Sequence, residues 1–293
     1  MRDERRRLRR RLRAASPGPR RLAAVAAAGS AAALLVAGCG SGGASPSHAG
    51  PAAAAASSSA AAPVPPRPVS AAKLASLPQA TTFAHLHGVP ADPQPSALTS
   101  GLVVHPRSTL AVYAAPGGAP VAALPATELG NPTWVPVVQE RPGWDEVLLP
   151  SRPNHASGWI STSGHALHVA ETQYVIRVDL AARRVTVLDS GREVGSWTAA
   201  VGAPRTPTPT GRTFLMASLE PAHPTYSPLI LPLGTHSNTL DTFGGGPGTV
   251  ALHGWPDASV FGHAVTHGCI RVPPAALHVL SHIPLGSLVL VSS

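Results

Sequence analysis

Short apolar runs separated by turn-forming residues dominate the chain between about residues 102 and 169. The turns contain Pro-Gly-Gly at 116–118, Arg-Pro-Gly at 141–143 and Arg-Pro-Asn at 152–154. Runs of this length and spacing predict a small all-β domain, which we place at residues 99–169. The expected strands cover residues 110–114, 135–139, 144–149 and 158–160.

Apolar and polar positions also alternate in the last part of the chain, at residues 170–293. The expected strands there cover residues 174–178, 185–187, 197–201 and 286–291. The best candidate for a helix is 275–281, because two prolines suited to a first helical turn precede it. The pattern therefore predicts a second domain that is mainly β.

A different composition precedes both domains. Residues 40–70 consist almost entirely of Ala, Ser, Pro and Gly, with almost no charge and no aromatic residue. Such a segment cannot bury enough apolar surface to offset the entropy of ordering the chain. We therefore expect a disordered tether over residues 39–98, with one short helix between residues 73 and 98.

Positive charge is concentrated at the N-terminus. Ten of the 22 Lys and Arg residues lie between Arg2 and Arg21, and they account for the formal net charge of +8. From Cys39 onward acidic and basic residues balance, so we expect no nucleic-acid partner. The basic stretch and the apolar run that follows predict a signal peptide over residues 1–38. A retained anchor helix and twin-arginine export are the alternatives, although the run is short for a membrane span.

The residues at the end of this leader, Val36-Ala37-Gly38-Cys39, resemble a bacterial lipobox. The resemblance implies cleavage before Cys39 and attachment of lipid to its sulfur, which would tie the protein to a membrane. The alternative use of this sulfur is a disulfide with Cys269, which lipidation excludes. The implied location is the outer face of the bacterial cytoplasmic membrane, in the cell wall.

The stretch Thr266-His267-Gly268-Cys269-Ile270-Arg271 carries the clearest candidate chemistry. A second His-Gly pair, His253-Gly254, begins sixteen residues before the cysteine. Imidazole can lower a thiol pKa so that a thiolate is available for acyl transfer, and Gly268 permits a tight turn beside the sulfur. These residues alone support a cysteine acyltransferase or hydrolase. The alternatives are a small buried thiol and a zinc site made from His253, His263, His267 and Cys269.

The ordered set of both His-Gly pairs, the cysteine and the arginine is similar to the signature of the L,D-transpeptidases, whose catalytic domain is of the YkuD type. The resemblance covers roughly residues 172–293, including the Pro-rich segment 206–211. It implies a YkuD-type β-sandwich in a mainly β protein. Relatives carry a small β-domain before it, so residues 99–169 are expected to be SH3-like or immunoglobulin-like. Trp144 and Trp159 would bind or space the cell wall there, or else fill the β core.

The resemblance also implies roles for the motif residues. Cys269 is the nucleophile and His253 the general base, with the backbone carbonyl of Gly254 orienting its ring and Asp257 as the weaker alternative. His267 and Gly268 shape the site, and the backbone N–H groups of residues 267–269 face the oxyanion. The implied substrate-binding residues are Arg271, Thr266, Tyr226 and His236.

The function implied is peptidoglycan transpeptidation. Cys269 would attack the stem peptide at the carbonyl before a terminal D-Ala, release D-Ala and leave a thioester. An amine from a second stem would then form a 3→3 cross-link, with peptidoglycan stem peptides as partners and without a cofactor or metal. With water as the acceptor the protein would be an L,D-carboxypeptidase. A zinc-binding hydrolase and a binding lipoprotein with a decayed site are the remaining alternatives.

Overall fold

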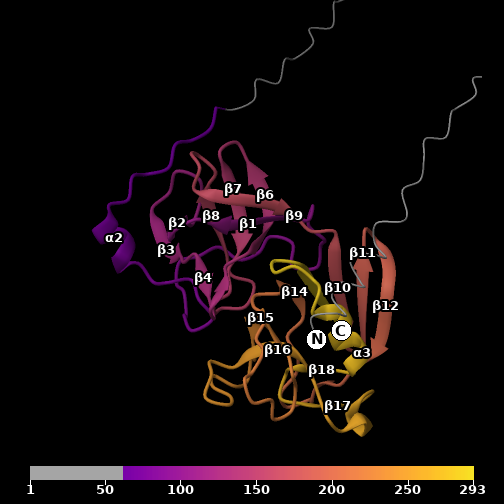
Figure 1. Ribbon diagram of the computed structural model, residues 1–293. Helices are drawn as coiled ribbons and strands as arrows, with labels where there is room; N and C mark the ends of the chain where they lie inside the picture. The colour runs from indigo at the N-terminus through magenta and orange to yellow at the C-terminus, as the bar shows by residue number, and fades with distance from the viewer. Residues whose placement is uncertain (1–61) are drawn as a thin grey trace, which may run out of the picture. The chain divides into compact units, whose positions relative to one another are not determined.

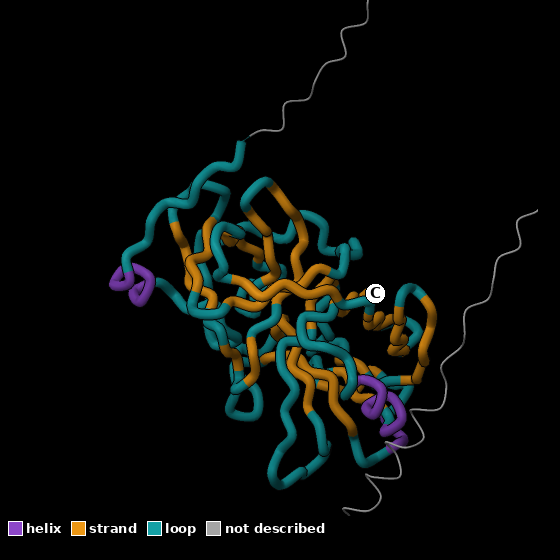
Figure 2. The backbone as a smooth tube through the Cα atoms, turned by 45° about the horizontal axis from the view of Figure 1, so that its top comes forward, coloured by secondary structure: helices purple, strands orange, loops and turns teal. Residues whose placement is uncertain are grey.

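A computed structural model describes residues 62–293 of the 293-residue chain. The predicted signal peptide, the predicted lipidation site at Cys39 and the first part of the predicted tether lie outside the described residues. The described part is mainly β, as the sequence predicted (Figures 1 and 2). No helix among residues 62–293 is both long and apolar enough to span a membrane.

Seven antiparallel strands form the first sheet, in the order β3-β2-β8-β7-β6-β1-β9 (Figure 1). Between β3 and β6 in the chain, β4 and β5 form a separate short hairpin. The four strands expected in this region are all present, each within two residues of its predicted bounds. The strands are β1 (Leu102–Pro106), β2 (Leu110–Tyr113), β3 (Pro120–Leu124), β4 (Thr127–Glu128), β5 (Asn131–Pro132), β6 (Val135–Arg141), β7 (Trp144–Leu148), β8 (Ser157–Ser161) and β9 (Leu167–Glu171).

The two tryptophans of this sheet are buried. Trp144 and Trp159 pack with Tyr113 in a small aromatic cluster, and the Tyr113 and Trp144 rings meet edge to face at 5.1 Å. The indole N–H of Trp144 donates to the carbonyl of Val64 at 2.7 Å. This burial favours the interpretation in which both side chains fill the β core.

Two further sheets face each other in the second part of the chain. The five-stranded sheet has the order β12-β11-β10-β19-β14, and the three-stranded sheet has the order β15-β16-β18. Two short strands, β13 and β17, pair separately. The elements are β10 (Tyr174–Asp179), β11 (Arg184–Asp189), β12 (Arg192–Thr198), β13 (Val201–Gly202), β14 (Gly211–Phe214), β15 (Ile230–His236), β16 (Thr249–Gly254), η1 (Ala258–Val260), β17 (Ala264–Thr266), β18 (Ile270–Val272), α3 (Pro274–Leu280) and β19 (Leu288–Ser292).

One apolar core joins these two sheets into a sandwich. It contains alternate residues of β10 and β11 from the larger sheet and of β16 and β18 from the smaller one. Three residues of α3 cover one end of this core. The helix predicted at 275–281 is confirmed, and Pro274 occupies its first turn. The core-facing residues include Ile176, Val178, Val185, Val187, Leu252, Ile270, Val272, Ala276, Leu277 and Leu280.

The expected strand 197–201 is interrupted. β12 ends at Thr198, and the chain then leaves β11 so that Ala200 pairs with Arg271 and β13 pairs with β17. Ala199 and Ala200 are completely buried at this crossing. The sequence prediction was wrong here because the apolar residues at 197–201 indicate a buried segment but not that its pairing changes from β11 to other strands.

The predicted tether is wrong for residues 62–98. They contain one helix, α2 (Ala71–Ser76), which begins two residues before the range expected for it and is capped by the hydroxyl of Ser70. Beyond α2, Leu77, Ala80 and Leu86 are buried, and backbone hydrogen bonds join the segment to existing strands, as from the Ala80 N–H to the Ala123 carbonyl. The average composition of the segment did not indicate these few buried apolar residues. Strands of the first sheet provide hydrogen-bond partners for its backbone N–H and C=O groups.

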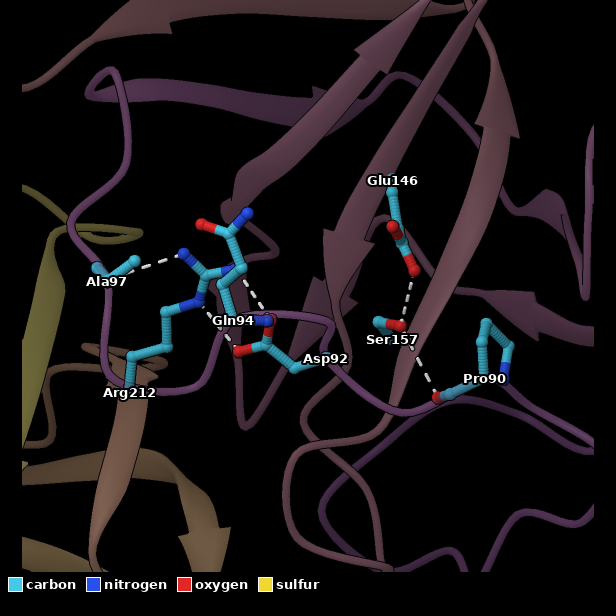
Figure 3. Close-up of polar contacts among 7 residues, drawn as sticks. All are labelled: Pro90, Asp92, Gln94, Ala97, Glu146, Ser157 and Arg212. Carbon is cyan, nitrogen blue, oxygen red and sulfur yellow. Dashed lines mark hydrogen bonds and ion pairs between the residues drawn. The ribbon is translucent and has the colours of Figure 1, made fainter.

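A buried ion pair fastens this segment to the second part of the chain (Figure 3). The Arg212 guanidinium on β14 donates two hydrogen bonds to the Asp92 carboxylate, and both side chains are almost inaccessible to solvent. Phe214 and Met216 continue into the core under the first sheet. The two sheet systems of residues 62–293 therefore share packing, and segment 77–98 is held between them.

Candidate active site

A cavity of about 500 Å³ lies on the face of the three-stranded sheet opposite its core. On β16, Leu252 points into the core, whereas Ala251 and His253 line the cavity. On β18 and the loop before it, Ile270 is in the core and Cys269 and Arg271 line the cavity. The two strands are parallel, with His253 opposite Arg271, so alternation along each strand brings thiol, imidazole and guanidinium to one face.

The turn before Cys269 depends on Gly268. Its φ is +116°, in a region where side chains are strained. The Thr266 hydroxyl accepts a hydrogen bond from the Gly268 N–H at 3.1 Å and donates to the Cys269 carbonyl at 2.6 Å. Thr266 lines the cavity, but its hydroxyl is occupied by this turn, which favours a bracing role over the expected substrate contact.

Two threonines of the Pro-rich segment support the same turn. Thr208 donates to the Gly268 carbonyl, and Thr206 donates to the Thr266 carbonyl, both at 2.8 Å. Thr208 also accepts from the N–H of Gly202 at 2.9 Å. A Cβ on Gly202 would lie 2.3 Å from the Thr208 backbone nitrogen, so only glycine permits this close approach.

One expected oxyanion donor is corrected. The Gly268 N–H is bound to Thr266 and is not free to meet a substrate oxygen. The backbone N–H groups of His267 and Cys269 remain the candidates for that role. The sequence prediction failed here because the motif does not show that the Thr266 hydroxyl binds the Gly268 N–H.

The ring of His253 is oriented by a backbone group, as expected. Its Nδ1 lies 2.7 Å from the carbonyl oxygen of Gly254, so Nδ1 carries the hydrogen and Nε2 presents a lone pair. His253 is buried, and the Asp257 carboxylate instead accepts from the Ser259 N–H at the start of η1. The backbone carbonyl is therefore the orienting partner, and Asp257 is not.

Burial keeps both reactive groups neutral. It lowers the pKa of His253, with a partly opposing effect from the Gly254 hydrogen bond and a further lowering by the Arg271 charge. Burial raises the pKa of the Cys269 thiol, which a hydrogen bond with the Ala251 backbone and the Arg271 charge partly offset. The expected resting thiolate is therefore corrected to a thiol that lines the same cavity as a neutral imidazole. Cys269 is a free, partly exposed cysteine, and within residues 62–293 no hydrogen bond joins its sulfur to a histidine ring.

Arg271 stacks on an aromatic ring at the edge of the cavity. Its guanidinium carbon lies 3.5 Å from the ring centroid of Trp255. Its Nε is buried and has no hydrogen-bond partner among the residues that the structure describes. Its backbone pairs with Ala200, so the strand and the stacking hold the residue while donors of the side chain stay available.

Three more aromatic or imidazole rings border the cavity. The Tyr226 ring meets the His253 ring edge to face at 5.0 Å, and the exposed His267 ring lies 4.8 Å from Phe243. Burial raises the pKa of Tyr226, and the Cys269 thiolate that forms at high pH raises it further. Tyr226 and His267 therefore lie where the sequence placed them, at the cavity.

His236 does not line the cavity, and this prediction was wrong. The side chain is fully buried, with Nε2 2.7 Å from the Thr82 carbonyl and 3.0 Å from the Thr82 hydroxyl. Burial lowers its pKa to about 4, so the ring is neutral. His236 ends β15, and Thr82, which covers its ring, comes from the segment interpreted as a tether.

Comparison with protein families decides the assignment. Residues 173–291 match the model of the YkuD, L,D-transpeptidase catalytic domain. This segment is a YkuD-type domain. The match contains both His-Gly pairs, the nucleophile candidate and the Pro-rich segment, and it begins directly after β9. The family resemblance inferred from the sequence is confirmed for this domain.

Solved structures, L,D-transpeptidases among them, show low overall likeness to the chain. The enzyme from Mycobacterium smegmatis is 18% identical, with a TM-score of 0.34 over 48% of this chain and 75% of that protein. L,D-transpeptidase 3 from Mycobacterium tuberculosis, in complex with a faropenem-derived adduct, is 16% identical, with a TM-score of 0.35 over 48% and 74%. Bd1075 from Bdellovibrio bacteriovorus is 27% identical, with a TM-score of 0.33 over 42% and 48%. A search of curated proteins finds no match.

The sequence did not identify several residues that line the cavity of the L,D-transpeptidase domain. Trp255 directly follows His253-Gly254, and this position after the motif was an available signal. Thr82 and Phe83 had no such signal, because they lie in an Ala- and Pro-rich stretch. Across residues 62–293, no three side chains of His, Cys, Asp or Glu are grouped as a metal site would require.

Proposed function

We propose that this protein is a peptidoglycan L,D-transpeptidase that forms 3→3 cross-links through a thioester on Cys269. The observation that carries the proposal is the shared cavity face of Cys269 and His253, with the Nε2 lone pair of His253 left free by the bond to Gly254. A neutral thiol needs a base at the moment of attack, and a neutral imidazole with this tautomer is such a base.

In the acylation step, His253 Nε2 takes the proton of the Cys269 thiol as the sulfur attacks the carbonyl before D-Ala. The oxyanion faces the backbone N–H groups of His267 and Cys269. As the C–N bond breaks, the imidazolium returns its proton to the departing amine of D-Ala. The product is a thioester and free D-Ala, with His253 neutral again.

In the second step, an amine of another stem attacks the thioester. It gives a proton to His253, the C–S bond breaks, and the proton then returns to the sulfur of Cys269. Arg271 lines the cavity, and this supports a role in holding a substrate carboxylate, because a guanidinium is a fixed fork of donors. His267 and Gly268 shape the turn that carries the nucleophile.

A neighbouring cavity favours an amine acceptor over water. It has a volume of about 570 Å³ and shares Tyr226 and Trp255 with the catalytic cavity. Two adjoining cavities offer room for two peptide substrates, whereas hydrolysis needs only one. L,D-carboxypeptidase activity is the alternative, and it differs only in the nucleophile that resolves the thioester.

The experiment incubates the mature protein with disaccharide tetrapeptides and identifies the products by mass spectrometry. We expect D-Ala and a 3→3 cross-linked dimer from the wild type, neither from Cys269→Ala, and a rate at least about 100-fold lower from His253→Ala. Free tripeptide without dimer would indicate the carboxypeptidase. Loss of activity on adding a chelator would favour the zinc-binding hydrolase, and product from Cys269→Ala would contradict the proposal.

We also propose that the protein is exported and lipidated at Cys39, as its Val-Ala-Gly-Cys stretch supports. Acyl chains would then hold the domain at the membrane beside its peptidoglycan substrate. Fractionation of expressing cells tests this. The wild type is expected with the membranes and Cys39→Ala in the soluble fraction, and equal distributions would contradict lipidation.

A further inference from the structure

One wall of the catalytic cavity comes from outside the YkuD-type domain. Thr82, Phe83 and Leu129 line the same cavity as Cys269 and His253, although the family match begins only at residue 173. The catalytic domain alone therefore lacks part of the surface that surrounds its nucleophile. We refer to Thr82, Phe83 and Leu129 as the N-terminal wall.

The backbone of the N-terminal wall is anchored at Thr82. Its N–H donates to Glu128, and its carbonyl accepts from His236. Its hydroxyl contacts His236 Nε2 at 3.0 Å and the Thr249 hydroxyl at 2.6 Å. Every polar group of Thr82 is thus bound, two of them to residues of the YkuD-type domain. These bonds fix the backbone position of the next residue, Phe83.

Leu129 is held in an unfavourable backbone conformation. It occupies the turn of the β4–β5 hairpin with a φ of +49°, where a side chain is strained and Gly or Asn is the usual residue. The Asn131 side chain donates to the Leu129 carbonyl at 3.0 Å and supports the turn. Strain of this kind concentrates at functional sites, and here it delivers an apolar side chain to the cavity.

Three exposed aromatic rings line this cavity, and one of them, Phe83, belongs to the N-terminal wall. Phe83 is 65% exposed, Phe243 is 51% exposed and Tyr226 is 40% exposed. All three line the one cavity that contains Cys269. Single exposed apolar residues are common, but three large rings around one cavity form a surface suited to an apolar contact with a ligand.

We propose that the N-terminal wall, through Phe83 and Leu129, contacts the peptide stem of the substrate and sets its affinity. This inference rests on the proposed function, because it takes the stem peptide as the acyl donor. A donor whose carbonyl reaches Cys269 must lie in this cavity, and the part of the donor adjoining that carbonyl is peptide. The apolar wall meets the aliphatic surface of that peptide, and the glycan lies farther from the reacting carbonyl.

The test measures binding and turnover separately in the full mature chain. Binding of an unglycosylated tetrapeptide and of the disaccharide tetrapeptide is measured by calorimetry in the Cys269→Ala background, which prevents turnover. The variants are Phe83→Ala, Phe83→Leu and Leu129→Asn, with Val194→Ala as the control, since Val194 is an exposed apolar residue that does not line this cavity. KM and kcat for cross-linking are measured with Cys269 present.

We expect Phe83→Ala to weaken binding of both ligands about tenfold and to raise KM by a similar factor, with kcat changed by less than about threefold. Phe83→Leu keeps apolar bulk and should retain most of the affinity. Leu129→Asn should weaken binding without lowering the melting temperature, because Asn tolerates a positive φ. That combination separates a contact with substrate from a purely structural role.

Unchanged peptide affinity in both Phe83→Ala and Leu129→Asn would overturn the inference and leave the proposed function intact. Weakened binding of the disaccharide form alone would also overturn it, because the wall would then contact sugar. If the wild type binds stem peptide but releases neither D-Ala nor a dimer, the proposed function fails, while the affinities of the variants still decide whether the wall contacts peptide.

Discussion

At the residue scale, the proposed chemistry depends on a cysteine and a histidine that are both uncharged at rest. The Gly254 carbonyl fixes the His253 tautomer, and burial moves the pKa values of thiol and imidazole apart. The proton must therefore move during the attack. Arg271 affects both groups, because its charge lowers the pKa of the thiol and of the imidazole.

This charge arrangement predicts a pH profile. The proposed base His253 can act only when neutral, and because burial lowers its pKa, that form persists to a pH below 6.5. Acylation by a carbapenem, whose strained β-lactam carbonyl can acylate a thiol, should therefore show an acid limb with a midpoint below 6.5 and a plateau through neutral pH. A rate that instead rises steadily through pH 8–9 would indicate that attack needs a preformed thiolate, and this would contradict the account.

Arg271→Met should move that profile. Removing the charge raises the pKa of His253, so the acid limb shifts to higher pH, and it also raises the pKa of Cys269. The same rate measurements on this variant and on Arg192→Met, an exposed arginine of β12, provide the comparison. Identical limbs in Arg271→Met and the control would exclude the electrostatic role.

At the element scale, the nucleophile turn could be predicted from the sequence, because Gly268 does need its positive φ. Strands β16 and β18, which carry His253 and Arg271, were not among the strands expected from the sequence. The supports of the turn could not be predicted, because Thr206 and Thr208 are about sixty residues away in the chain. Hydroxyl-to-carbonyl bonds over such separations leave no periodic pattern.

Thr208→Val should weaken the nucleophile turn. The valine fills the same buried space but loses the donor to Gly268 and the acceptor for Gly202, leaving two backbone groups unpaired. Loss of such pairing costs about 1–3 kcal/mol, so we expect a lower free energy of unfolding and a kcat reduced about tenfold. Denaturant titration and steady-state kinetics measure both. The matched control is Thr210→Val, an exposed threonine two residues on, and equal effects in the two variants would argue against the brace.

At the scale of the whole molecule, the segment 77–98 joins the first sheet to the YkuD-type domain. The Asp92–Arg212 pair and the bonds of Thr82 fasten it, and Phe214 packs under the first sheet. Sequence reasoning predicted two mainly β regions but took this segment for part of a tether. Its stability comes from long-range pairing with partners that a composition average does not register.

Glu128 provides a test of that junction. The carboxyl group accepts from the Thr82 N–H, its second oxygen has no partner among residues 62–293, and burial raises its pKa from 4.5 to about 7. Because the folded-state pKa is raised, the stabilising contribution is complete below about pH 4.5 and is lost as pH rises through about 7. Above that pH the folded protein must bury a carboxylate.

Glu128→Gln should therefore be more stable than the wild type at pH 8, on the order of 2 kcal/mol, with the difference shrinking toward pH 4.5. Thermal unfolding at a series of pH values measures this. The contribution of His236 to stability changes with pH in the opposite direction, and it is the same in the wild type and in Glu128→Gln. The difference in stability between the two proteins therefore reports on Glu128 alone. Glu193→Gln, at an exposed position of β12, is the control, and a parallel pH dependence of Glu128→Gln and the wild type would refute the prediction.

The most direct measurement of the central claim is the intact mass of the mature protein after incubation with a carbapenem, followed by peptide mapping. The account predicts a single covalent adduct located on Cys269, absent from Cys269→Ala and formed at least about 100-fold more slowly by His253→Ala. A folded protein that forms no adduct, or an adduct on another residue, would contradict it.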